Sequence, residues 1–206
     1  MAADFHAHRP KSAARTLVSC AAEELSRYPL TSLELHPWKL PEAYEPLTPE
    51  FKAALEHAAA LGEIGLDRLR GPSPAVQQAY LDELLALAGA MQKPVVIHCV
   101  RATAELLAAL KRHPRLSVLL HGFRGKPEQL EMLRRHGLFV SLGPKALNGA
   151  LLEHLRLSGL DRIGFETDDA PEPVEQLLEE AAGHMHLPYR SLEARTDGTF
   201  GQFLGI

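Results

Sequence analysis

The chain has 206 residues, of which 46% are hydrophobic and 23% are charged, and its formal net charge is −4. At about 150 residues per domain, this length predicts a single domain over residues 1–206, and the hydrophobic share excludes a disordered chain. The slight acidity argues against a broad basic surface for duplex DNA but leaves room for a local anion site. Only two cysteines are present, which favours reduced thiols and a cytoplasmic location.

The sequence also carries no signal for a membrane. Its first residues, MAADFHAHRP, lack the basic and apolar regions of a signal peptide. No apolar run approaches the ~18 residues that a membrane-spanning helix needs. We therefore expect no membrane segment and no membrane partner.

Short apolar runs alternate with longer helical patterns along the chain. Runs such as PVVIH and LSVLLH are apolar at every position, as in parallel strands that helices cover on both faces. Eight segments are predicted as strands: Ala3–His8, Thr16–Cys20, Thr31–His36, Ala60–Leu66, Pro94–Cys99, Leu116–His121, Leu138–Leu142 and Arg162–Thr167. This alternation predicts an α/β fold of the TIM type, a compact (β/α)8 barrel.

Helix signals occupy several of the connections. Thr48 followed by Pro49 is typical of a helix start, and an apolar stripe runs through Pro74–Met91. Gly137 stands where a helix from Pro127 to His136 would end.

The lengths of the connections qualify the barrel prediction. Residues 100–115 and 122–137 are long enough for a crossover helix, but Arg9–Arg15 and Ala21–Leu30 have room for one or two helical turns. Because such a barrel typically takes about 250 residues, we expect a possibly distorted barrel whose first two crossovers are shortened.

Polar residues at the ends of the predicted strands carry the chemistry. His6 and His8 are two residues apart on the first strand, so their rings face the same side. Candidate ligands at or near the ends of four other strands are Glu63, His98, His121 and Asp168. Parallel barrel strands end at one mouth, where active sites are built. Four imidazoles and two carboxylates suit divalent metals, and one bridging carboxylate could hold a metal pair.

Each of these residues taken alone has a simpler interpretation. A single histidine at a strand end more often packs or caps, Glu63 could pair with a buried arginine, and Asp168 could cap a helix. Six such residues in barrel order favour a metal site over these separate explanations.

The motifs around these residues resemble those of the TatD family of metal-dependent hydrolases, within the amidohydrolase-like barrels. The family's D-x-H-x-H matches residues 4–8, G-E-x-G-L-D matches residues 62–67, P-V-x-x-H-C matches residues 94–99, H-x-F-x-G matches residues 121–125 and E-T-D matches residues 166–168. Residues 35–38 echo its G-x-H-P-x signature. The motifs run in order over about four fifths of the chain.

The resemblance implies a TIM-type fold with two divalent metal ions per chain. The implied ligands are His6, His8, Glu63 and Asp168 for one ion, and Glu63, His98 and His121 for the other. The identity of the ions stays open among Mg, Mn, Zn, Fe and Ni. The family's activity is that of a deoxyribonuclease, often exonucleolytic.

Three departures from the family pattern concern residues that face the substrate. Asp169–Glu172 replaces a Ser-Pro-aromatic stretch, Arg124 stands where many members have Ser, and Thr199–Phe203 lacks the usual Asn. They leave the implied ligands intact and put the identity of the substrate in question.

Further residues have candidate roles. Asp168 is the candidate general base for a water whose pKa a metal lowers towards ~7, with a pure ligand role equally open. Arg101 and Arg124 follow ligand-bearing strands and could clamp phosphate, or could be solvated loop charges. His36 could belong to the site or to a packing corner, and Trp38 could stack on a base or pack at the rim.

Three acidic residues are predicted to support the ligands because a metal-bound histidine normally donates its other N–H to an acceptor. They are Asp4, Asp67 and Glu166.

We therefore expect a divalent-metal-dependent phosphodiesterase or deoxyribonuclease acting on DNA or on a small phosphorylated substrate. The acidic balance and short loops favour, as an alternative, hydrolysis of an ester, amide or phosphoester in a small molecule. A catalytically quiet barrel that serves as a binding or assembly partner would show a broken ligand set, and this sequence breaks none. The oligomeric state stays open.

Overall fold

The computed structural model of the chain describes residues 1–12, 14–147 and 149–206. Its strands form one eight-stranded sheet in chain order, and the described pairings are parallel. The strands are β1 (Ala3–Ala7), β2 (Arg15–Cys20), β3 (Thr31–Leu33), β4 (Ala60–Asp67), β5 (Val95–Val100), β6 (Val118–Leu120), β7 (Phe139–Leu142) and β8 (Ile163–Phe165). All eight predicted strands are confirmed.

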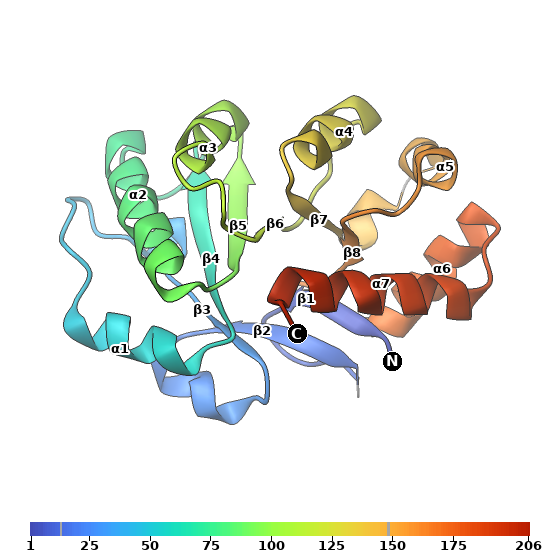
Figure 1. Cartoon of the computed structure of the whole chain (residues 1–206), viewed down its shortest axis with the longest axis horizontal. Coiled ribbons are helices and arrows are strands. Elements are labelled where there is room, and N and C mark those ends of the chain that lie inside the picture. Colours follow the sequence, from blue (N-terminus) through green and yellow to red (C-terminus); the bar gives the residue numbers. More distant parts are fainter. Residues whose placement is uncertain (13, 148) are drawn as a thin grey trace. The chain divides into compact units, whose positions relative to one another are not determined.

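Helical segments lie between these strands, and two of them, α6 and α7, follow the last strand (Figure 1). They are the 3-10 helices η1 (Ala22–Arg27), η2 (Pro37–Lys39) and η3 (Pro144–Ala146), and the α-helices α1 (Pro49–His57), α2 (Pro74–Met91), α3 (Thr103–Leu110), α4 (Pro127–Arg135), α5 (Gly149–Ser158), α6 (Val174–Met185) and α7 (Tyr189–Leu204). The described residues between β1 and β2 contain no helix, and η1 is the one helical segment between β2 and β3. The shortened first two crossovers are therefore confirmed.

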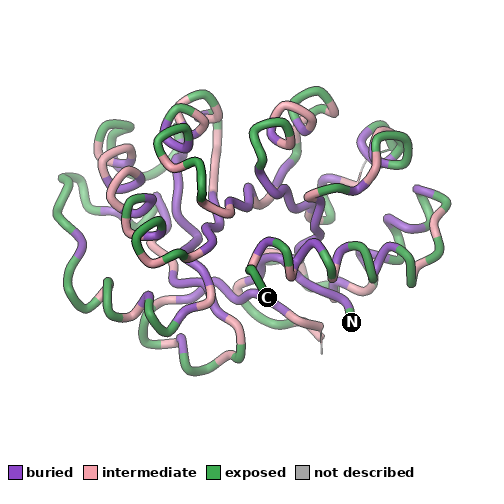
Figure 2. The backbone as a smooth tube through the Cα atoms, viewed as in Figure 1, coloured by how far each residue is buried: buried purple, intermediate pink, exposed green. Residues whose placement is uncertain are grey.

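Two compact units make up the chain. Unit 1 comprises Met1–Val18 and Leu119–Ile206, and unit 2 comprises Ser19–Val118. In both units the strands are mostly buried and the helices alternate buried with exposed positions (Figure 2). The single domain expected over residues 1–206 stays a prediction.

In unit 2, the long strand β4 lies against β5 and is covered by α2. Helix α2 begins after Ser73, whose hydroxyl accepts a hydrogen bond from the Val76 amide, and it has the bounds that its sequence predicts. The approach of β4 to β5 depends on Gly65, which pairs with His98 at a φ of +145°. A Cβ at this position would lie 1.9 Å from the carbonyl oxygen of His98, so only glycine permits this approach.

In unit 1, the ends of β1 and β8 meet. Ala7 forms a parallel bridge with Asp168, and the Asp168 amide donates to the carbonyl of His6 over 3.0 Å. Helix α7 contacts both strands, and its Phe200 ring lies 5.0 Å from the Phe5 ring in an edge-to-face contact. This packing places the residue after β8 beside the histidines of β1.

Among the described residues, no helix combines the length and the apolar character that crossing a membrane requires.

Candidate metal centre

Three predicted ligands of unit 1 form one cluster, which we call the Asp168 triad. His6 lies on β1, His8 directly follows this strand, and Asp168 follows the end of β8. The Nε2 atoms of His6 and His8 lie 3.8 Å and 3.6 Å from the same oxygen, Oδ1 of Asp168. Their rings lie 5.2 Å apart, which confirms that the two histidines face the same side. The side chains of His8 and Asp168 are 35% and 32% exposed, so solvent reaches this triad.

The backbone at Asp168 is unusual. Its φ is +51°, in the left-handed region that residues other than glycine, asparagine and aspartate rarely adopt. This turn directs the carboxylate towards β1 while the amide stays hydrogen-bonded to His6. Local strain of this kind is characteristic of functional sites.

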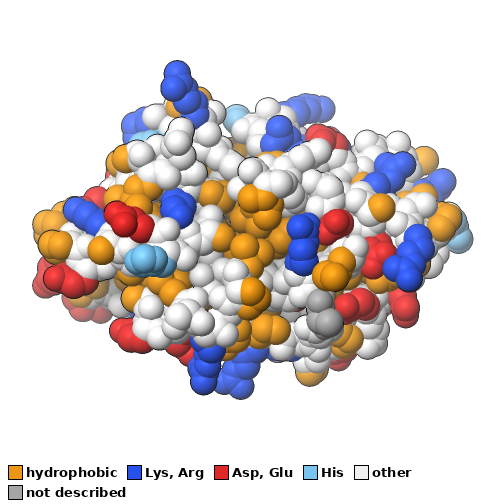
Figure 3. All heavy atoms as spheres, turned by 60° about the horizontal axis from the view of Figure 1, so that its bottom comes forward, with side chains coloured by type: hydrophobic (Ala, Val, Ile, Leu, Met, Phe, Trp, Pro, Cys, Tyr) orange, Lys and Arg blue, Asp and Glu red, His pale blue; other side chains and the backbone are white. Residues whose placement is uncertain are grey.

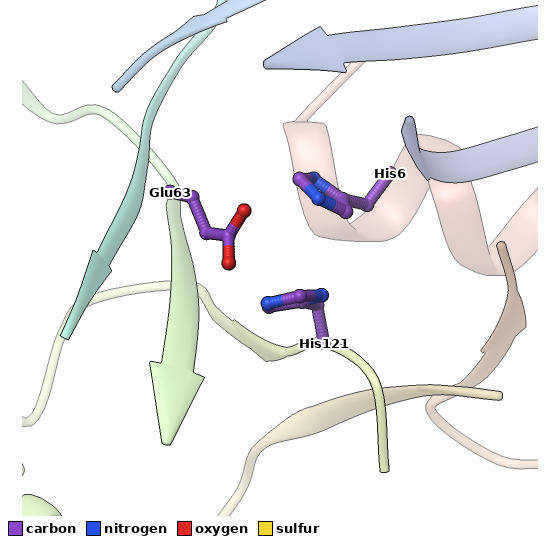
Figure 4. Close-up of side chains that lie close together, drawn as sticks. All are labelled: His6, Glu63 and His121. Atoms are coloured by element: carbon purple, nitrogen blue, oxygen red, sulfur yellow. The ribbon is translucent and has the colours of Figure 1, made fainter. Parts of the chain in front are cut away.

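His121 and Glu166 extend this cluster. His121 follows β6, and its ring lies 4.4 Å from the His6 ring. Figure 4 labels both side chains. Nδ1 of His121 is 3.4 Å from Oε1 of the buried Glu166, whose other oxygen accepts from Ser141. Burial alone would raise the pKa of Glu166, but the charge of His121 and these hydrogen bonds outweigh it and lower the pKa.

Asp4 ties β1 to the residues after β8. Its carboxylate accepts from the amide of Thr167 over 2.9 Å and from the hydroxyl of Thr167 over 2.7 Å. Burial raises the pKa of Asp4 to about 6 despite these two donors. Glu166 thus contacts the predicted ligand His121, whereas Asp4 contacts Thr167. The supporting role of both acids stays a prediction.

Three residues of unit 2 form a second cluster, which we call the Glu63 triad. Glu63 lies on β4 (Figure 4), His98 lies on β5, and His36 begins η2 just after β3. Oε1 of Glu63 is 2.9 Å from Nδ1 of His98 and 3.1 Å from Nε2 of His36. The side chain of Glu63 is 3% exposed. The Ser19 hydroxyl accepts from the Glu63 amide and holds this part of β4.

Neighbouring hydrogen bonds determine which ring nitrogen of His98 could bind a metal ion. Nε2 of His98 lies 3.1 Å from Oδ2 of Asp67, which also accepts from the indole nitrogen of Trp38 over 2.7 Å. Burial acts to raise the pKa of Asp67, but these donors and the Leu69 amide lower it. The ionised carboxylate only accepts, so the Nε2 of His98 carries a proton, and in the neutral ring Nδ1 presents a lone pair to Glu63.

This arrangement fits a metal ion. The lone pair of His98 Nδ1 and a carboxylate oxygen of Glu63 are both acceptors, yet they lie 2.9 Å apart. Two acceptors at this distance repel each other unless a proton or a cation lies between them. Imidazole nitrogen and carboxylate oxygen are the donors that divalent transition metals prefer, and Asp67 supplies the supporting acceptor that such a histidine usually has.

The same reasoning gives His36 a different role from that of His98. Nδ1 of His36 accepts from the backbone amide of Trp38 over 3.2 Å. The proton of the neutral ring is therefore on Nε2, which donates to Glu63. His36, predicted as a substrate contact, thus lies in the cluster as a hydrogen-bond donor to Glu63.

A pocket of about 340 Å³ opens beside the Asp168 triad in unit 1. Asp168 and Glu166 line it together with Arg124, a predicted substrate contact, and Lys145, which sequence reasoning missed. Lys145 follows β7, so its place just beyond a strand end was the available signal. Arg101, the other predicted contact, is exposed directly after β5 in the left-handed conformation, with a φ of +53°.

The structure thus gathers the predicted ligands into clusters inside each unit. His6, His8, His121 and Asp168 belong to unit 1, while Glu63 and His98 belong to unit 2. The implied sharing of Glu63 by two ions joins residues of both units and stays a prediction. On the face shown in Figure 3, basic and acidic side chains are interspersed, in keeping with the net charge of −4.

Comparison with known proteins identifies relatives. The profile of the family described as TatD related DNase matches residues 9–190. The chain is 38% identical over 135 residues to the uncharacterized metal-dependent hydrolase YjjV of Escherichia coli (strain K12), covering 62% of this chain and 49% of YjjV. It is 36% identical over 116 residues to the 3'-5' ssDNA/RNA exonuclease TatD of Erwinia tasmaniensis, covering 53% of this chain and 45% of that protein. The chain thus spans about half the length of these curated relatives.

A solved structure shares the fold. The crystal structure of YjjV, a TatD homologue from E. coli K12, matches with a TM-score of 0.78 at 25% identity and covers 93% of this chain and 86% of that one. With the eight parallel strands and intervening helices described above, this likeness confirms the predicted TIM-type α/β fold.

Proposed function

The chain belongs to the TatD-related DNase family, and we propose that it is a divalent-metal-dependent phosphodiesterase that cleaves DNA. The contact between Nδ1 of His98 and Oε1 of Glu63, two acceptors 2.9 Å apart, is the observation that carries this proposal. In the neutral ring of His98 these two acceptors repel each other, and a divalent cation bound by both would remove that repulsion.

We further propose two divalent ions per chain, one at the Glu63 triad and one at the Asp168 triad. The ligand types admit Mg, Mn, Zn, Fe or Ni, and supply in the cell decides among them as much as geometry does. Ions bound there polarise water and phosphoryl oxygens, the chemistry of metal-assisted hydrolysis. Asp67 and Glu166 keep His98 and His121 oriented towards their ions.

The residues of the chain supply proton transfer and substrate binding. Asp168, one third exposed at the pocket, accepts the proton of the attacking water or acts as a ligand alone. Arg124 and Lys145 line the same pocket and bind non-bridging phosphate oxygens, for which the fork of an arginine is well suited. Arg101 is proposed as a further phosphate contact, and His36, both of whose ring nitrogens are engaged, is proposed to orient Glu63. The free thiols of Cys20 and Cys99 fit the reducing conditions of the cytoplasm, the proposed location.

An activity screen of the metal-reconstituted protein tests this function. We expect nucleotide release from single-stranded DNA with Mg²⁺ or Mn²⁺, and none from His98→Ala. Hydrolysis of phosphomonoesters or amides without cleavage of DNA would instead support the small-molecule alternative, which the acidic balance of the chain favours. Absence of metal binding by elemental analysis and titration would refute both.

A further inference from the structure

Trp38 is the only tryptophan of the chain, and 46% of it is exposed. It lies in η2, beside the Glu63 triad. Its ring makes edge-to-face contacts with His36 at 4.6 Å and with His98 at 5.5 Å. A large aromatic ring half open to water, in contact with two histidines of a candidate metal site, is in a position to bind substrate.

The orientation of this ring is fixed. The indole N–H donates to Asp67 over 2.7 Å, so the polar edge of the ring points into the protein. The guanidinium carbon of the exposed Arg70 lies 4.5 Å from the ring centroid, in a cation–π contact. The exposed part of the indole is therefore apolar, and a positive charge lies over the ring.

We propose that Trp38 and Arg70 form a nucleobase-binding subsite of the proposed nuclease, on which its substrate preference rests. The indole stacks on an unpaired base, and Arg70 binds a phosphate of the same strand. Bases of every type have a π face, so the subsite accepts any sequence. Bases inside a duplex are already stacked on one another, so the subsite selects single-stranded ends over intact duplex.

The single tryptophan allows a direct test without catalysis. Fluorescence of Trp38 is measured in the presence of EDTA while oligothymidylate is added, with an abasic oligonucleotide of equal length and charge as the control. We expect saturable quenching by oligothymidylate and at least about tenfold weaker binding of the abasic strand, since stacking contributes ~1–3 kcal/mol per base. Equal quenching by both strands, or none by either, would overturn the proposal.

Two variants separate stacking from a purely structural role of Trp38 through Asp67. Trp38→Phe keeps an aromatic ring but loses the indole N–H, whereas Trp38→Ala loses both. Anisotropy of a labelled oligonucleotide should show binding weakened about tenfold or more in Trp38→Ala and largely retained in Trp38→Phe. Equal weakening in both variants would assign the effect to Asp67 and contradict the proposal.

This test is independent of the proposed hydrolysis. If the protein cleaves DNA but oligothymidylate and the abasic strand bind equally, the nucleobase subsite is wrong and the nuclease stands. If oligothymidylate binds in preference and no phosphodiester is cleaved under any metal, the subsite stands and the catalytic function is wrong.

Discussion

The two triads differ in how far the chain orders them before any ion binds. In the Glu63 triad, the atoms that face each other are 2.9 Å and 3.1 Å apart, and every member has a hydrogen-bond partner that sets its orientation. In the Asp168 triad, the corresponding distances are 3.6 Å and 3.8 Å, and two of its members are about one third exposed beside a pocket.

This difference indicates that the two triads have different roles in binding ions and substrate. A preorganised and buried donor set binds an ion tightly, because little freedom is lost on binding and the supporting acceptors are already in place. A looser and solvated set leaves room for water and substrate near the ion. We therefore expect the Glu63 triad to fill first and the Asp168 triad to host the exchanging ligands.

Loss of the tightly ordered triad should have the largest effect. His98→Ala should lower DNA cleavage by more than about 10⁴-fold, because the metal contribution to the barrier is lost. Elemental analysis should show the loss of about one ion per chain. His154→Ala, which removes a histidine paired with Glu131, is the matched control and should keep wild-type activity. Cleavage by His98→Ala near the wild-type rate would show that this triad is not catalytic.

The looser triad is probed through its carboxylate. Asp168→Asn should lower kcat by about 10²- to 10⁴-fold if the carboxylate is the base, while the ion at the Glu63 triad is retained. Asp161→Asn changes a strongly exposed acid of the same unit outside the pocket lining and should have little effect. Wild-type kcat in Asp168→Asn, at saturating metal, would exclude Asp168 as the base.

The effect of preorganisation on metal affinity is tested at Asp67, which contacts the proposed ligand His98. Asp67→Asn should weaken the tighter metal affinity by about 10- to 100-fold, because the amide no longer orients His98 as an anion does. Metal titration followed by tryptophan fluorescence measures this affinity directly. The exposed Asp82→Asn serves as control. An unchanged affinity in Asp67→Asn would mean that the ordering of His98 does not depend on this carboxylate.

The pocket beside the Asp168 triad should contribute more to binding than to chemistry. Arg124→Ala should raise KM for DNA by about tenfold, as expected for loss of one charge-assisted phosphate contact, and Arg124→Lys should recover part of it. Steady-state kinetics at constant salt distinguish an effect on KM from an effect on kcat. A pure kcat effect in Arg124→Ala would move this residue from binding to catalysis.

The smallest effect concerns stability and a residue that belongs to neither triad. Burial would raise the pKa of Glu83, but the Leu47 amide, the Tyr44 hydroxyl and Lys52 outweigh it and lower the pKa. The folded pKa thus lies below the unfolded value of about 4.3. Its contribution to stability is present above that value and is lost as the pH falls through the folded pKa.

Thermal unfolding at pH 7 and pH 3 measures this loss. Wild type should lose about 1 kcal/mol more than Glu83→Gln, in keeping with a partly exposed group. Equal losses in both proteins would show that Glu83 is not involved.

Strand periodicity was enough to predict the whole set of strands and the bounds of α2, because burial on both faces leaves a clear pattern in sequence. Strand ends were less accurate. His36, His121 and Thr167 were placed within strands but lie just beyond them. At these positions the backbone leaves the sheet, as at Asp168, whose turn uses the carbonyl of His6. Such turns depend on contacts from distant segments, which periodicity does not encode.

The types of the ligand residues were predictable from the sequence, but their protonation states were not. The sequence placed His98 at a strand end and Glu63 inside a strand, yet the proton position on His98 depends on Asp67 and Trp38, whose contacts arise only in the folded unit. Lys145 was missed because its strand ends in no metal-ligating residue, and only the shared pocket connects it to Asp168.

Calorimetric titration of the metal-free protein with Mn²⁺ tests most directly whether the two triads differ in metal affinity. We predict two ions per chain with distinct affinities, the tighter one lost in His98→Ala and the weaker one lost in Asp168→Ala. A single class of sites, or retention of the tighter site in His98→Ala, would contradict the account.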